Sequence, residues 1–202
     1  MTMRGTPYIY QGDELGMTNY QFKSMDEFND IEALNGYKDE VQGRHIVTEA
    51  AYIENLRHMS RDNARTPMQW DNSPNGGFTT GAKPWLAVNP NYKDINAAQE
   101  QGDPNSIYSY YARMAKFREK TPALIYGDFK DLDPQNAAIF AYTRILGEEK
   151  YLIVLNFSNR EIDYTLPTGL KAGQLQLSNL GTREEKTSVL KLKGWEARVY
   201  KQ

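Results

Sequence analysis

Apolar residues recur at helical spacing in three segments before about residue 120 and alternate with polar residues beyond it. Apolar side chains recur every three or four positions in segments that predict helices over residues 30–42, 48–59 and 104–120. Asn29 or Asp30 can cap the first of these helices and Thr48 the second, because a short polar side chain accepts hydrogen bonds from unpaired N–H groups of the first turn. The last helix should end at Thr121, which precedes a proline and therefore resists helical geometry.

The remainder of the chain has a period of two, which predicts short β-strands. We expect strands over residues 138–145, 151–157, 162–166, 174–177, 188–192 and 197–200, with a hairpin turn over residues 147–150. Short strands at this spacing are typical of a β-sandwich. We therefore place a boundary near residues 122–127 and predict domains over residues 1–121 and 122–202.

An aromatic and β-branched run between Gly5 and Gly12 has the composition of a buried strand. No other strand is predicted near it in sequence, and an unpaired strand would leave its N–H and C=O groups without partners. We therefore expect the chain to be a fragment of a larger fold. From residue 71 to residue 102 the periodicity disappears and turn signals follow closely, a pattern typical of a functional surface.

Composition narrows the possible ligands. The formal charge is −2 and no basic stripe is present, which argues against a nucleic-acid partner. The chain has no cysteine, no apolar run long enough to cross a membrane and no recognisable leader, so we expect a cytoplasmic protein without a membrane partner. His45 and His58 are isolated, and we assign neither a metal nor a cofactor. The 14 tyrosines suit a carbohydrate surface, although many such residues serve as half-buried core.

Residues 60–71 carry the most specific chemistry of the chain. This segment combines Arg61 and Arg65 with Asp62, Asp71 and Trp70. Arginine and carboxylate groups can form paired hydrogen bonds to neighbouring hydroxyls, and an indole offers a flat apolar face to a sugar ring. The segment therefore reads as a sugar-facing loop. The alternative is a surface turn that is fixed by local ion pairs.

Two motifs, at residues 5–17 and 60–70, resemble the α-amylase superfamily (glycoside hydrolase family 13) and within it the oligo-1,6-glucosidase and α-glucosidase group. Residues 30–35, 77–81 and 84–85 support the resemblance, which extends over essentially the whole chain. It implies a mixed α/β and all-β fold: the terminal part of a (β/α)8 barrel, with the last strand, inserted loop helices and closing helix, followed by an antiparallel β-sandwich C-terminal domain.

The resemblance also implies which chemistry belongs to this chain. Such enzymes hydrolyse glycosidic bonds with retention through a carboxylate nucleophile and a carboxylic acid. Those groups precede the eighth barrel strand, so we assign no catalytic residue here, although Asp13, Glu14 and Asp62 are carboxylates near the motifs. The expected partners are a small oligosaccharide and the upstream remainder of the barrel.

Three positions are candidates for substrate binding by the same resemblance. Arg61 matches the residue that bonds the glucose on the nonreducing side of the cleaved bond, and Glu32 matches one that contacts the sugar on the leaving side. Arg65 has a weaker claim to contact and is expected mainly to fix the loop. The competing interpretations are a solvated helix acid for Glu32 and a structural pair with Asp62 for Arg61.

Two other functions fit the same sequence. The first is a stand-alone carbohydrate-binding β-module, in which aromatic residues stack on glycan and no reaction occurs. The second is part of a related trehalose-6-phosphate hydrolase or sucrose isomerase, because a fold does not determine a reaction. The motifs choose neither between α-1,6 and α-1,4 linkages nor between these reactions.

Overall fold

A computed structural model describes residues 1–182 and 187–202 of the chain. The chain divides into two compact units, one made of Met1–Tyr8 with Ala112–Gln202 and the other of Ile9–Tyr111. We call them the β unit and the helical unit. This division records which residues pack together, and the domain boundary expected between residues 121 and 122 stays a prediction.

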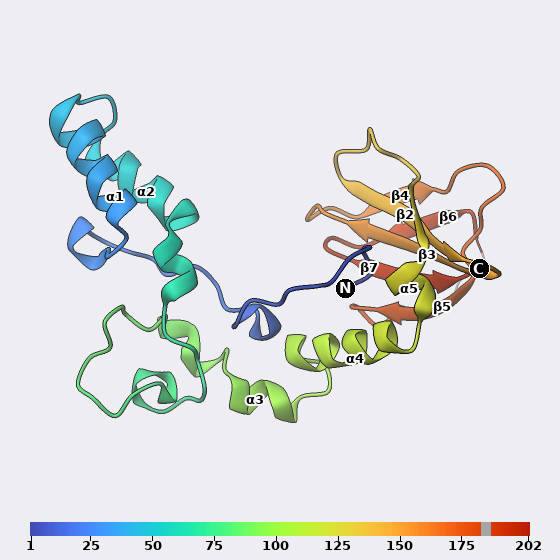
Figure 1. The fold of residues 1–202 in the computed structure, drawn as a ribbon, viewed down its shortest axis with the longest axis horizontal. Helices are drawn as coiled ribbons and strands as arrows, with labels where there is room; N and C mark the ends of the chain where they lie inside the picture. Colours follow the sequence, from blue (N-terminus) through green and yellow to red (C-terminus); the bar gives the residue numbers. More distant parts are fainter. Residues whose placement is uncertain (183–186) are drawn as a thin grey trace. The chain divides into compact units, whose positions relative to one another are not determined.

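The β unit contains two antiparallel sheets within the described residues (Figure 1). The larger sheet has the order β1-β2-β3-β7-β5, and β4 pairs with β6 in the smaller one. The strands are β1 (Asp128–Asp131), β2 (Ile139–Leu146), β3 (Glu149–Asn156), β4 (Ile162–Thr165), β5 (Gln174–Ser178), β6 (Val189–Leu192) and β7 (Ala197–Lys201). All six expected strands are therefore confirmed, whereas β1 was not expected, because its Asp-Phe-Lys-Asp sequence lacks the apolar alternation of a strand.

Both faces of the larger sheet are covered. On one face, Ala141, Leu152 and Val154 pack with Tyr164 of β4 and Leu190 of β6 in a core shared by the two sheets. This packing confirms the expected sandwich arrangement. On the opposite face, residues of β2, β3 and β7 pack with the two helices α4 (Ile107–Glu119) and α5 (Pro122–Tyr126). Pro122 lies at the start of α5, where its missing N–H group has no cost because the first turn of a helix leaves its N–H groups without intrahelical partners.

Two buried arginines bind the N-terminal residues to the β unit, and Figure 1 shows that end of the chain beside the strands. Arg144 donates to the carbonyl oxygens of Thr2 at 2.7 Å, Leu124 at 2.8 Å and Gly127 at 2.9 Å. Arg118 donates to Met3 and Leu124, both at 2.9 Å. Among the described residues neither arginine pairs with a carboxylate, so backbone carbonyls alone compensate for the burial of their charge.

A buried ion pair between Glu196 and Arg198 lies near the C-terminal end of the same unit. Glu196 accepts hydrogen bonds from Arg198 Nε at 2.8 Å and from the Lys193 N–H at 2.8 Å, and it is also bonded by Thr182. Burial alone would raise the pKa of the Glu196 carboxyl, but these hydrogen bonds outweigh it and hold the pKa below its usual value. Glu196 is therefore a structural carboxylate.

The expected buried strand between Gly5 and Gly12 is wrong for this chain. The structure has no strand there among the described residues, and Tyr8 is 93% exposed. An extended segment becomes a strand only where a neighbour supplies hydrogen-bond partners, and none pairs with it here. The apolar side chains of Ile9 and Tyr10 are exposed as well.

The helical unit contains the expected helices in altered form. The helix predicted over residues 30–42 is an α-helix, α1 (Ile31–Gly36), that continues as a π-helical stretch, η3 (Tyr37–Gly43). Its N-cap is Asp30. The helix predicted over residues 48–59 is α2 (Glu49–Met59), capped by Thr48, whose hydroxyl accepts from the Ala51 N–H at 3.3 Å.

Close packing of α1 on α2 depends on a glycine. The Tyr52 hydroxyl donates to the Ala33 carbonyl at 3.0 Å, and a side-chain carbon at Gly36 would lie 2.2 Å from that hydroxyl oxygen. Any larger residue at Gly36 would displace Tyr52. Phe22, Phe28 and Ile53 complete the core of this unit.

Short elements connect these helices to the rest of the unit. They are η1 (Asp13–Leu15), η2 (Met25–Glu27), η4 (Arg61–Arg65), η5 (Pro74–Gly77), η6 (Pro90–Lys93) and α3 (Ala97–Gly102). The stretch from residue 71 to residue 102 is irregular as expected, apart from its single turns and α3. Among the described residues, no helix has the length and apolar character needed to cross a membrane.

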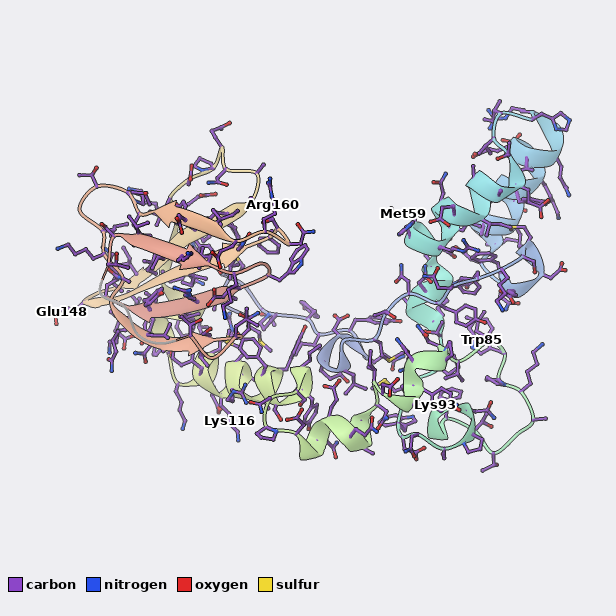
Figure 2. The ribbon with its side chains drawn as sticks, turned by 180° about the vertical axis from the view of Figure 1, so that it is seen from behind. Met59, Trp85, Lys93, Lys116, Glu148 and Arg160 are labelled. Carbon is purple, nitrogen blue, oxygen red and sulfur yellow. The ribbon has the colours of Figure 1, made fainter. Side chains whose placement is uncertain are left out.

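Replacement of Arg144 by methionine should destabilise the β unit. The substitution removes the arginine donor of the buried Thr2 and Gly127 carbonyls, while the Leu124 carbonyl keeps Arg118, which should cost roughly 2–4 kcal/mol of local stability. Native-state hydrogen exchange of the β2 and β3 amides measures the effect. Arg160, which lies on a surface loop (Figure 2), provides the matched control, and Arg160→Met should change stability by less than about 0.5 kcal/mol. Equal exchange rates in the two variants would contradict the role given to Arg144.

Candidate functional site

The charged residues of the 60–71 segment meet the start of α1 in one cluster. Helix α2 ends at Met59, and the Ser60 hydroxyl then accepts from the Asp62 N–H at 3.2 Å, which starts the turn η4. This turn carries Arg61, Asp62 and Arg65. We call these three residues, together with Asp30 and Glu32, the arginine cluster.

Asp62 is the buried centre of the arginine cluster. Its side chain is fully buried, and Oδ2 accepts from the backbone N–H groups of Asn29 at 2.7 Å and Asp30 at 2.8 Å. The other oxygen, Oδ1, lies 3.4 Å from Arg65 Nη1. These contacts compensate the buried charge and join η4 to the residues that precede α1.

Asp30 holds Arg61 in a two-point contact. Arg61 Nη2 lies 3.2 Å from Asp30 Oδ1, and Arg61 Nε lies 3.3 Å from Asp30 Oδ2. Asp30 also caps α1 by accepting from the Glu32 N–H at 3.4 Å. Arg65 is 3.8 Å from Asp30 Oδ1, so the same carboxylate faces both arginines. The hydrogen bond that Arg61 donates to Asp30 raises the pKa of the Arg61 guanidinium.

The cluster presents its charges to solvent on one side. The Arg61 side chain is 50% exposed and its Nη2 lies 2.9 Å from Oε1 of Glu32, a side chain that is 76% exposed. The buried acid Asp30 fixes the orientation of this guanidinium, whose remaining N–H groups face solvent. It can therefore donate hydrogen bonds to hydroxyl oxygens without reorganising. An exposed carboxylate beside it can accept from hydroxyl hydrogens.

The structure thus brings the three candidate binding residues Arg61, Glu32 and Arg65 together. The suggested structural pair between Arg61 and Asp62 is wrong, because Asp62 faces Arg65 while Arg61 reaches Asp30 and Glu32. The sequence interpretation missed the second role of Asp30, which it recognised only as a helix cap. A signal was present, because an aspartate that caps a helix can use its second oxygen for an arginine.

The residues that follow η4 fix the loop. Gln69 is fully buried and donates to the Ile95 carbonyl at 2.6 Å, and the Thr66 hydroxyl donates to the Asn63 carbonyl at 3.2 Å. Trp70, by contrast, is 52% exposed. Met59 and Trp85 are exposed as well and project outward in Figure 2.

A cavity of about 300 Å³ lies on the helical unit beside η4. Its lining includes Tyr10, Asp13, Asn19, His58 and Asn63, but none of the three candidate binding residues. Glu14, next to it, accepts from the Gly12 N–H at 2.8 Å and so anchors an amide of the loop. The described residues include no group of acidic, histidine or cysteine side chains arranged to hold a metal ion.

Comparison with known proteins identifies the family. Residues 1–127 match the alpha amylase catalytic domain, and residues 139–199 match the alpha-amylase SusG C-terminal domain. The chain belongs to the alpha-amylase family. Its fold class is confirmed by these matches: the terminal part of a (β/α)8 barrel followed by a β-sandwich domain.

Relatives of similar sequence include several glucosidases. The oligo-1,6-glucosidase of Parageobacillus thermoglucosidasius is 43% identical over 202 residues, which are 98% of this chain and 36% of that enzyme. The glucan 1,6-alpha-glucosidase of Streptococcus pneumoniae serotype 4 is 46% identical over 170 residues, or 84% of this chain and 31% of the relative. The trehalose-6-phosphate hydrolase of Bacillus subtilis is 38% identical over 98% of this chain and 36% of that protein.

Solved structures with the same fold include sucrose-converting enzymes. A trehalulose synthase mutant in complex with Tris is 47% identical with a TM-score of 0.93, over 100% of this chain and 36% of that one. The isomaltulose synthase of Klebsiella sp. LX3 is 45% identical with a TM-score of 0.94, over 99% of this chain and 36% of that one. The chain thus spans about a third of the length of the proteins it matches.

Replacement of Asp62 by alanine should release the residues before α1. The Asn29 and Asp30 amides lose their acceptor, so their hydrogen exchange should accelerate at least about tenfold. Two-dimensional NMR of the exchanging chain measures this change. Asp94→Ala, at an exposed carboxylate of the same unit, is the matched control and should leave both amides unchanged. Unaltered exchange at Asn29 and Asp30 in the Asp62 variant would show that Asp62 does not hold the cluster.

Proposed function

We propose that this chain is the C-terminal part of an exo-acting α-glucosidase of the oligo-1,6-glucosidase type, which hydrolyses α-glucosidic bonds of short oligosaccharides with retention. The observation that carries the proposal is the two-point contact of Asp30 on a half-exposed Arg61, in a chain 43% identical to an oligo-1,6-glucosidase. Such an arrangement suits the binding of neutral hydroxyl groups.

The residues of the arginine cluster have separate roles in this proposal. Arg61 donates to hydroxyls of the glucose on the nonreducing side of the cleaved bond. Glu32 contacts the sugar on the leaving side, and Arg65 supports the loop through Asp62 and secondarily contacts substrate. The catalytic carboxylates belong to the upstream remainder of the barrel, so the chain supplies substrate-binding residues to the shared pocket but does not cleave the bond by itself.

The remaining parts of the proposal concern partners and location. The partners are a small oligosaccharide and the upstream barrel, without nucleic acid or membrane. The formal charge of −2 supports the exclusion of nucleic acid. The lack of cysteine in the sequence supports a cytoplasmic location. We also propose that the boundary between the barrel part and the β-sandwich lies between residues 121 and 122.

A sucrose isomerase is the second candidate. The trehalulose and isomaltulose synthases match 99–100% of this chain at 45–47% identity, which is as close as the glucosidases. The trehalose-6-phosphate hydrolase is a more distant third at 38% identity. Product analysis with sucrose separates the glucosidase from the sucrose isomerase, because an isomerase yields a rearranged disaccharide whereas a hydrolase releases monosaccharides.

A stand-alone carbohydrate-binding β-module is the non-enzymatic alternative, and the self-contained core of the β unit favours it.

Replacement of Arg61 by alanine in the full-length parent protein should lower kcat/KM for isomaltose about a hundredfold, because charge-assisted hydrogen bonds to substrate contribute roughly 1.5–3 kcal/mol each. Steady-state kinetics of glucose release measures this loss. Arg44→Ala is the matched control, since Arg44 is an exposed arginine paired with Asp39 in the same unit, and it should change kcat/KM less than about twofold. Equal kinetics of the two variants would remove Arg61 from the substrate site.

A further inference from the structure

A second cavity lies on the β unit, away from every residue of the arginine cluster in sequence. Its volume is about 240 Å³. The side chains that matter for its chemistry are Asp131 at the end of β1, Asp133 and Asn136 in the loop before β2, Phe140 in β2, and Phe157 just after β3. It thus combines two carboxylates and an amide with two phenyl rings.

Hydrogen bonds within the loop fix the polar side of the cavity. Asp131 Oδ1 accepts from the Asp133 N–H at 3.0 Å, and Asp133 Oδ2 accepts from Asn136 Nδ2 at 2.9 Å. Asn136 Oδ1 in turn accepts from the N–H groups of Ala138 at 3.1 Å and Ile139 at 2.9 Å. Each carboxylate therefore uses one oxygen to shape the loop, and carboxylate oxygens accept hydrogen bonds from hydroxyl donors.

The apolar side of the cavity is formed by rings of different exposure. Phe157 is 59% exposed, so its ring is accessible to a ligand. Phe140 is held by Tyr142, with ring centroids 4.8 Å apart. The flat apolar face of a phenyl ring is suited to stack on the C–H face of a sugar.

From these observations we propose that the Asp131, Asp133, Asn136, Phe140 and Phe157 cavity is a second carbohydrate site, which binds a glucosyl unit of a neutral α-linked oligosaccharide and performs no chemistry. The choice of an α-linked glucosyl ligand rests on the proposed function. Two carboxylates and no basic side chain among the described lining residues disfavour phosphorylated or sulfated sugars. Carboxylate oxygens accept from neighbouring hydroxyls while a ring stacks against the pyranose.

The test is an NMR titration of the complete 202-residue chain with isomaltose and with maltotriose. Saturable shifts of the Asp133, Ala138 and Phe157 amide signals are expected. Phe157→Ala and Asp133→Asn should each weaken binding about tenfold, the effect of losing roughly one stacking or charge-assisted contact. Tyr126→Ala and Asp128→Asn are matched controls on exposed positions of the same unit and should bind as the unaltered chain does.

Further measurements distinguish sugar binding in this cavity from sugar binding at the arginine cluster. Arg61→Ala should leave the titration unchanged, whereas loss of binding in that variant would locate the sugar at the arginine cluster and overturn the proposal. No saturable shift with either sugar, or a response to choline chloride in place of sugar, would also overturn it. Each variant must retain the β2 and β3 amide pattern, so that weaker binding is not unfolding.

Failure of this proposal and failure of the proposed function give different results. Hydrolysis of isomaltose by the full-length parent without any shift at the Phe157 cavity would contradict only the second site. Binding at the cavity by a parent protein that does not act on α-glucosides would contradict only the proposed function.

Discussion

The buried carboxylate of Asp62 is the constraint on which the arginine cluster depends. It joins η4 to the residues before α1, which are 32 and 33 positions away in sequence, through two backbone N–H groups. A carboxylate with no exposure is tolerated only when charged or N–H donors surround it. Since Asp62 fixes the Asp30 backbone, and Asp30 fixes Arg61, the orientation of the exposed guanidinium follows from a group that itself never reaches solvent.

The β unit uses buried charge differently. Arg118 and Arg144 donate to backbone carbonyls of the N-terminal segment and to that of Leu124 in α5, whereas Glu196 and Arg198 neutralise each other. All four side chains are buried within the β unit, and the β unit and the helical unit each have an apolar core. A β-sandwich with a complete core can therefore present a binding surface of its own, independent of the arginine cluster.

The spacing of apolar residues and the capping residues predicted those helices and strands that are stabilised by contacts close in sequence or repeated along one face. The α2 helix begins at its Thr48 cap, and the strands of the β unit follow the alternation of apolar residues, because in both cases the determining contacts are close in sequence or repeated along one face. Strand β1 escaped prediction because an edge strand needs hydrogen bonds from β2 more than it needs apolar side chains. The expected strand at residues 6–11 is absent because no described residue forms strand hydrogen bonds with that segment.

The sequence predicted which residues lie together in the candidate site, but it did not predict which arginine pairs with which carboxylate. The motif placed Arg61, Glu32 and Arg65 in one site, and the structure brings them together. The exchange of partners, in which Asp62 faces Arg65 and Asp30 faces Arg61, depends on the turn geometry of η4, which sequence spacing does not reveal.

The central claim is that this chain contributes binding groups, but no bond-breaking carboxylates, to a split α-glucosidase. Glucose release from isomaltose by the purified 202-residue chain tests it most directly, measured alone and after addition of a polypeptide with the upstream barrel. The account predicts no turnover above the uncatalysed background by the chain alone and turnover only with the upstream part. Sustained glucose release by the chain alone would contradict it.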